Sequence, residues 1–284
     1  TGYGFKRSRI EDAPPALKAS AEFQGACPAC AAFMSLPLQA ARPAPTGDLP
    51  VAVLGAGPVG LAAAARLIER GMPFLLLEAG SQVGAHLLDY GHVRLFSPWQ
   101  YNVDASMAAQ LRPSGWVAPP AEELPLAREI VEQVLHPFAA LPAVAGALRL
   151  DTRVLAISRE GFDKVKSAGR EQAPFVIRAH QQGRPIEFRA RAVIDATGTW
   201  GRPNPVGANG LAALGEAEAA AQIFYGIPDL LGAQRQRYAG RRSLVVGAGH
   251  SAANALLALA ELAQQAPGTR LAWAVRSPAL QRVY

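Results

Sequence analysis

Small residues recur twice in this chain with a spacing that suits a phosphate-bearing dinucleotide. The two sets are Gly55, Gly57 and Gly60 in GAGPVG, and Gly247, Gly249 and Ala252 in GAGHSA. In such a loop the first glycine allows a tight turn and the second lets the backbone approach a pyrophosphate. The third lets the next helix pack closely against the strand. The helix N-terminus then offers free N–H groups to the phosphates. Two copies predict a protein that holds two dinucleotides.

The first set lies between a predicted strand, Val51–Leu54, and a predicted helix over residues 60–70, with Pro58 inside the loop. A second apolar run, Phe74–Leu77, ends in Glu78, the acidic group that such a site uses to hold ribose hydroxyls. The alternative is an ordinary turn with Glu78 as a solvated strand end. The order strand, glycines, helix, strand and acid favours the dinucleotide site.

The second set has the same context, with predicted strands over 243–246 and 271–275 and a predicted helix over 251–264. His250 and Ser251 begin that helix, where Ser251 could either cap the helix or contact a phosphate. The second strand is followed by Arg276 rather than an acid. An arginine suits a 2′-phosphate through charge-assisted contacts, so we expect NADPH here. A solvated arginine at a strand end is the alternative.

The remaining pattern predicts an α/β protein with a Rossmann-like three-layer fold and a β-meander. Residues 84–125 read as a long functional loop region with short helices, of which 105–111 is one candidate. The other predicted elements are a helix over 127–135 reaching toward 140, and strands over 153–158, 175–179, 186–190 and 192–195. We expect an N-terminal extension and Pro/Ala linker over 1–49, a first nucleotide domain over 50–239, and the start of a second over 240–284.

Composition excludes several classes of protein. Half of the 284 residues are apolar and 18% are charged, which permits a large core. The net charge of +6 is spread over single arginines without aromatic interleaving, so we expect a small-molecule substrate and no nucleic-acid partner. The sequence has no membrane-length apolar run and no secretory signal pattern, so a cytoplasmic location is the default. Self-association into a homo-oligomer is left open.

The chain starts with Thr1 rather than Met and stops one strand–helix–strand into the second nucleotide motif, so we expect a fragment. Cys27 and Cys30 have the spacing of a redox dithiol or of half a zinc site. They have no second pair and precede the first glycine loop, which favours a chance pair or a remnant. The five histidines show no metal-ligand spacing, so no metal is predicted.

Residues 50–276 resemble the two-dinucleotide flavoprotein superfamily, and within it the flavin-containing monooxygenase-like branch. The similar stretches, in chain order, are GAGPVGLAAA, Glu78 with Val83 and Gly84, Thr152-Arg153-Val154, AVIDATGTWGRPNP with Thr197 and Gly198, and YAGRRSLVVGAGHSA. The resemblance implies FAD at the first loop, with Gly84, Val154, Thr197 and Gly198 near it. It also implies NADP at the second loop, where the final alanine is similar to NADP-binding variants.

The resemblance implies an NADPH-using, FAD-dependent oxidoreductase that is monooxygenase-like and acts through a C4a-(hydro)peroxyflavin. The catalytic residues are unknown, since that chemistry needs no side-chain nucleophile. Three positions depart from the pattern: Ala85, Leu87 and Leu230, which stands where the branch has a histidine. The alternatives are an NADPH-dependent reductase or oxidase that does not oxygenate, and a non-catalytic flavin-binding fragment.

Overall fold

The computed structural model describes residues 48–207 and 209–276. All of them belong to the second of two units into which the chain divides, Ala44–Tyr284. Cys27, Cys30 and nearly all of the predicted extension lie outside the described residues.

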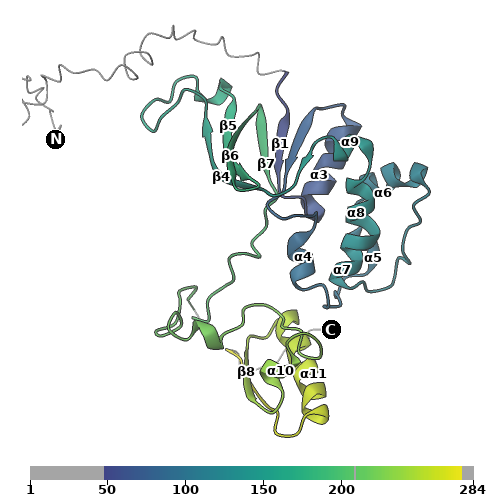
Figure 1. Cartoon of the computed structure of the whole chain (residues 1–284), viewed down its shortest axis with the longest axis vertical. Helices are drawn as coiled ribbons and strands as arrows, with labels where there is room; N and C mark the ends of the chain where they lie inside the picture. The colour runs from purple at the N-terminus through teal and green to yellow at the C-terminus, as the bar shows by residue number, and fades with distance from the viewer. Residues whose placement is uncertain (1–47, 208, 277–284) are drawn as a thin grey trace, which may run out of the picture. The chain divides into compact units, whose positions relative to one another are not determined.

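A parallel sheet forms the middle layer of this unit (Figure 1). Its strands are β1 (Val51–Leu54), β2 (Phe74–Leu77), β3 (Leu148–Arg149) and β7 (Ala192–Asp195), in the order β3-β2-β1-β7. All three strand pairs are parallel, so the carboxyl ends of the strands meet at one edge. That edge is where ligands bind in open α/β sheets.

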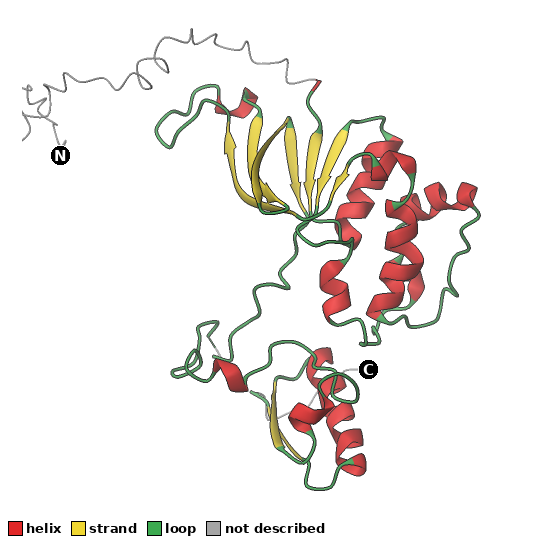
Figure 2. Cartoon of the chain, in the orientation of Figure 1, coloured by secondary structure: helices red, strands yellow, loops and turns green. Residues whose placement is uncertain are grey.

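Side chains of the central strand alternate between two cores, as a strand period of two requires. Val51 and Val53 join a large cluster with the helices, whereas Ala52 and Leu54 join a smaller cluster with the meander. The meander consists of β4 (Thr152–Arg159), β5 (Phe175–Gln181) and β6 (Arg184–Ala190), all antiparallel. Helices and meander therefore cover opposite faces of the parallel sheet (Figure 2).

The helical layer is built around α3 (Pro58–Glu69). Its other members are α4 (Ala85–Asp89), α5 (Trp99–Asn102), α6 (Ala105–Leu111) with a 3₁₀ turn (Arg112–Ser114), α7 (Ala127–Ile130), a π-helical turn (Val131–Leu135), α8 (His136–Ala139) and α9 (Pro142–Ala145). The elements from α7 to α8 form one helical run, as the pattern over 127–140 predicts. The run is irregular, because its middle turn is wider than an α-helix.

A separate two-stranded parallel sheet carries the second glycine loop. It pairs β8 (Arg242–Val246) with β9 (Arg270–Ala274), and α11 (His250–Gln265) connects them, with α10 (Arg235–Tyr238) before β8. Its core cluster of buried residues contains Leu230, Ala255, Leu259 and Leu262. Leu230 precedes the predicted boundary at 239/240, yet it packs with the second motif.

The predicted strands and helices are present, with bounds that are identical or differ by one or two residues. The segment after the second strand contains α4 and α5 in addition to the predicted helix over 105–111, while α9, β3 and α10 were not predicted. No helix among the described residues is both long and apolar enough to span a membrane.

Candidate dinucleotide-binding sites

The first glycine loop follows β1, and two of its three glycines have no room for a side chain. Gly55 has φ +93°, and a Cβ there would lie 2.7 Å from the carbonyl oxygen of Ala196. A Cβ on Gly60 would overlap the carbonyl oxygen of Gly55. Side chains are therefore excluded at Gly55 by backbone conformation and space, and at Gly60 by the contact between helix and strand.

Gly57, in contrast, faces open space. No atom lies within 4 Å of where its Cβ would be, and its backbone is extended at φ −80° and ψ −172°. Gly57 is the N-cap of α3, and Pro58 is the first helical residue, where its missing N–H costs nothing. The open side of Gly57 lies at the N-terminus of α3, where free backbone N–H groups suit an anion.

The backbone N–H and carbonyl of Ala56 are both held by residues that follow β2. Its N–H donates to Oε2 of Glu78 at 2.7 Å, and its carbonyl accepts from the N–H of Gly84 at 3.0 Å. Oε1 of Glu78 also accepts from the N–H of Gly80 at 2.7 Å. The Glu78 side chain, in a residue only 9% exposed, thus fixes the loop.

Gly84 adopts φ +67° at the N-terminus of α4, a conformation that favours glycine. A Cβ there would come within 2.8 Å of Val131, so this glycine also allows α4 to approach the helical layer. Ala85 and Leu87, the departures from the family pattern, are both in α4, and Leu87 is buried in the large core.

The segment after β7 lies directly beside the first glycine loop. The N–H of Ala196 donates to the carbonyl of Leu54 at 2.9 Å. Oδ1 of Asp195 accepts from both the hydroxyl and the N–H of Thr197, at 2.7 and 3.1 Å, which lowers the pKa of the Asp195 carboxyl. Thr197 and Gly198 are exposed on this turn, next to Gly55 in space.

The meander reaches the same edge through Glu78. The N–H of Thr152 donates to the carbonyl of Glu78 at 2.7 Å, and Val154, two residues further along β4, is half-buried against the sheet. The structure therefore brings the loop 55–60, Glu78, Gly84, Thr197 and the start of β4 to one edge of the parallel sheet.

The second loop repeats the backbone geometry of the first. Gly247 has φ +125°, and Gly249, the N-cap of α11, has φ −90° and ψ −177°. A Cβ on Gly249 would meet no atom within 4 Å, as at Gly57. His250 and Ser251 form the first turn of α11, and no side chain caps this helix at Gly249.

The second loop differs from the first at its third position and beyond. Ala252 is buried, so the space between β8 and α11 admits a methyl group that the first loop would not. The indole N–H of Trp273 on β9 donates to the carbonyl of Gly247 at 2.6 Å. Arg276 lies two residues after β9 and is exposed; no acid corresponds to Glu78 there.

Leu230 is buried with 2% exposure in the core beside α11. The family histidine position therefore faces a hydrophobic cluster in this chain. Earlier in the same segment, the Tyr225 hydroxyl donates to Glu216, which raises the pKa of Tyr225 and lowers that of Glu216. Glu216 also accepts from the N–H groups of Val206 and Ala213, so this carboxylate organises the loop between the two motifs.

Two features near these loops were not predicted from the sequence. The Phe96 ring, 57% exposed, stacks on the imidazole of His250 with centroids 3.9 Å apart. The Asn102 amide donates to the carbonyls of Ser97 at 2.7 Å and Pro98 at 2.8 Å and so braces its own loop. Neither pairing leaves a local sequence signal.

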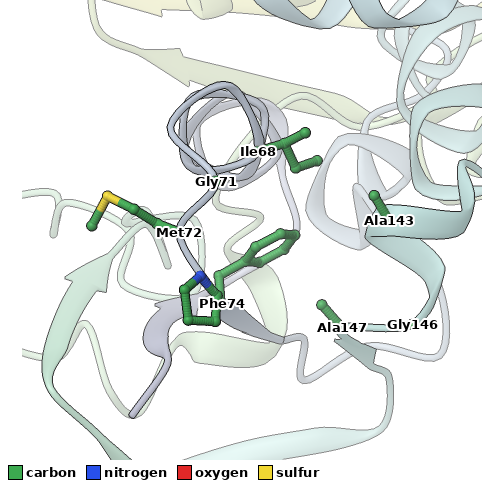
Figure 3. Close-up of a pocket in the computed structure, with 8 residues that line it drawn as sticks. Ile68, Gly71, Met72, Phe74, Ala143, Gly146 and Ala147 are labelled. Atoms are coloured by element: carbon green, nitrogen blue, oxygen red, sulfur yellow. The ribbon is translucent and has the colours of Figure 1, made fainter. Parts of the chain in front are cut away.

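A shallow apolar cavity of about 500 Å³ lies away from both glycine loops (Figure 3). Its walls include Ile68, Met72 and Phe74, at the start of β2, and Ala143 and Ala147 from the segment before β3. This is the amino end of the parallel strands, opposite the edge where the candidate site residues gather. The cavity is therefore not part of the dinucleotide site.

Comparison with known protein families identifies the type of domain that the first part of the chain resembles. Residues 53–118 match the family model described as an NAD(P)-binding Rossmann-like domain. This part of the chain thus has a Rossmann-like fold. No curated protein matches the chain.

Solved structures then identify the fold more closely. A bacillithiol disulfide reductase from Bacillus cereus is 18% identical, with a TM-score of 0.56, over 82% of this chain and 60% of its own. A double mutant of a flavin monooxygenase from Stenotrophomonas maltophilia is 25% identical, with a TM-score of 0.50, over 81% and 58%. An ornithine N-hydroxylase from a Kutzneria species is 17% identical, with a TM-score of 0.54, over 81% and 54%.

The superfamily expected from the motifs is therefore confirmed at the level of the fold: this chain has the fold of the two-dinucleotide flavoproteins. The chain spans between 54% and 60% of the length of these three proteins.

Gly60→Ala should destabilise the protein by about 3 kcal/mol or more, because the added methyl overlaps a backbone oxygen that cannot move without displacing α3. Gly57→Ala is the matched control, since its backbone conformation and surroundings accept a methyl, and its effect should stay within about 1 kcal/mol. Urea unfolding measures both. Equal losses would contradict the close approach at Gly60.

Proposed function

We propose that this chain is part of an oxidoreductase that binds FAD at the first loop and NADPH at the second. The observation that carries the proposal is the repeated cap geometry, with Gly57 and Gly249 both extended, both open to solvent and both at helix N-termini. A single such loop is common to many nucleotide-binding proteins, whereas two in one chain suit a pair of redox dinucleotides.

The residues at the first loop fit FAD. The pyrophosphate would lie against Gly57 and the first N–H groups of α3, where the helix dipole favours negative charge. Glu78 would accept ribose hydroxyls while it continues to hold the loop through Ala56. Thr197 and Gly198 would lie beside the same cofactor, because the turn after β7 packs on Gly55. The Kutzneria relative was solved with reduced FAD and NADP⁺.

The residues at the second loop fit NADPH. Gly249 and the first turn of α11, with His250 and Ser251, would bind the pyrophosphate. Arg276, beyond the end of the next strand, would contact the 2′-phosphate that distinguishes NADPH from NADH. The side chain at this position is cationic where the first motif has an anion, and that contrast supports different cofactors at the two loops.

When bound, the two cofactors would supply the redox chemistry, a hydride passing from the nicotinamide to the flavin. The task of the chain is to bind, orient and shield them. Glu78 and Gly84 fix the first loop in place, and Asp195 fixes the turn that carries Thr197. Ala252 and Trp273 hold the second loop against its strands.

Two reaction outcomes are compatible with this arrangement. The monooxygenase-like outcome, in which reduced flavin and oxygen act on a soft nucleophile or a ketone, is supported by the family resemblance and by the flavin monooxygenase fold. A reductase or oxidase that does not oxygenate is supported by Leu230, whose burial leaves no side chain at that position to contact a cofactor. The disulfide reductase neighbour has the same fold.

The products of NADPH oxidation distinguish the two outcomes. With FAD, NADPH and a panel of thioether, amine and ketone substrates, monooxygenation gives labelled product from ¹⁸O₂ with little peroxide. Oxidase activity instead gives peroxide stoichiometric with NADPH consumed, and no label in any substrate.

Gly57→Val should lower FAD affinity at least about tenfold, because its side chain would occupy the space left for the pyrophosphate. Quenching of flavin fluorescence during titration measures the affinity. The unfolding midpoint should remain near that of the unmodified chain. Unchanged FAD binding in a folded variant would overturn the assignment of the first loop.

Arg276→Ala should raise the KM for NADPH by about 10- to 100-fold and leave that for NADH nearly unchanged, since only NADPH carries the 2′-phosphate. Arg270→Ala, at the other end of β9, is the matched control and should alter neither. Steady-state kinetics with both nicotinamides measure the effect. An equal loss for the two would contradict the 2′-phosphate contact.

A further inference from the structure

The turn that follows β7 carries an aromatic residue, Trp200, three residues beyond Thr197. The residue is 39% exposed, and its indole N–H donates to Oδ2 of Asp89 at 2.8 Å. Asp89 is the last residue of α4 and lies 111 positions earlier in the sequence. The bond therefore joins two segments that follow different strands of the parallel sheet, β2 and β7.

The Trp200 ring has two further neighbours. It packs on the ring of Tyr90, with the centroids 4.6 Å apart and the ring planes inclined at 43°. Aromatic pairs at such a distance attract each other beyond the area that they bury. Gly226 faces the same indole, because a Cβ on this glycine would lie 3.2 Å from Cη2 of Trp200. The orientation of the indole is therefore set by its ring as well as by its N–H.

The bond between Trp200 and Asp89 closes a circuit of contacts that begins and ends at the first glycine loop. In the loop, the carbonyl of Ala56 accepts from the N–H of Gly84, the N-cap of α4. α4 ends at Asp89, which accepts from Trp200. From Trp200 the chain leads back to Ala196, which packs on the start of the loop. The segments that flank the loop thus hold one another in place.

The turn 197–200 needs such a hold because little else restricts it. All four residues are exposed, and Gly198 has φ +67°, a conformation that favours glycine. Asp195 holds the start of the turn through Thr197, whereas Trp200 holds its end. A free turn of this kind loses conformational entropy when a ligand orders it, and that loss weakens binding. A turn that is already fixed avoids most of the loss.

We propose that Trp200 is a positioning residue for the first dinucleotide site, and that its bond to Asp89 preorganises the turn 197–200 for FAD. The inference rests on the proposed FAD site at the first loop, and it adds the pair of residues that joins the two segments flanking that loop. The pair acts through the position of Thr197 and Gly198, without a contact of its own with the cofactor.

Titration of the full chain with FAD, followed by the change in flavin fluorescence, tests the proposal. Trp200→Phe keeps a ring for Tyr90 but removes the N–H, and it should weaken FAD binding about three- to tenfold. Asp89→Leu removes the acceptor and should have the same effect. Asp89→Asn retains a carbonyl oxygen that accepts the same bond, so its affinity should stay within about twofold. The double variant Trp200→Phe/Asp89→Leu should bind no worse than either single variant, because both changes remove one interaction.

Trp116→Phe is the matched control, since the Trp116 indole N–H donates to the carbonyl of Gln133 at 2.6 Å and neither residue belongs to the circuit. Its FAD affinity should equal that of the unmodified chain. Unfolding midpoints without FAD should change little in all variants, because the bonds removed are exposed. Unchanged binding in Trp200→Phe, additive losses in the double variant, or an equal loss in Trp116→Phe would overturn this inference alone. Failure of the unmodified chain to bind FAD would overturn the proposed function together with it.

Discussion

The first candidate site depends on the backbone of Ala56. It is fully buried, donates to Glu78 and accepts from Gly84, so two segments that follow β2 are tied to the loop that follows β1. This position is available only because Gly55 turns at φ +93° and Gly60 lets α3 come into contact with the turn. Without those two glycines, α3 would be displaced from the strand ends, and the N-terminus that faces the open side of Gly57 would no longer be aligned with Glu78.

Much of this site was predictable, because its determinants are local. Gly55, Gly60 and Glu78 can be recognised in the sequence, because each requirement restricts the residue type at one position. These requirements are a positive φ, a close contact between helix and strand, and an acid at the end of a strand. The two hydrogen bonds that Glu78 accepts, from Ala56 and Gly80, were not predictable, since they depend on how two loops fold together. The same applies to β3, only two residues long and recruited to the sheet by pairing with β2 rather than by its own pattern.

The two glycine loops have similar backbone conformations but differ in the contacts that stabilise them. The first is closed by steric exclusion at Gly60 and by hydrogen bonds to a buried carboxylate. The second accepts a methyl at Ala252, and an indole N–H from Trp273 holds it instead. A more tightly braced loop suits a cofactor that stays bound through turnover. A loop with fewer fixed contacts suits one that must leave after each hydride transfer, so the asymmetry agrees with FAD at the first loop and NADPH at the second.

The segment that links the two motifs bears most directly on what would follow flavin reduction. Sequence comparison alone marks Leu230 as a missing histidine, which reads as a lost function. The structure gives the position a different role, because Leu230 completes the small core beneath α11 together with Leu259 and Leu262. A core of so few buried side chains tolerates a polar residue poorly, so histidine could not be restored there without repacking α11. The second loop begins that helix, and therefore the residue that stabilises α11 in this chain also occupies the position where the resemblance implies a histidine.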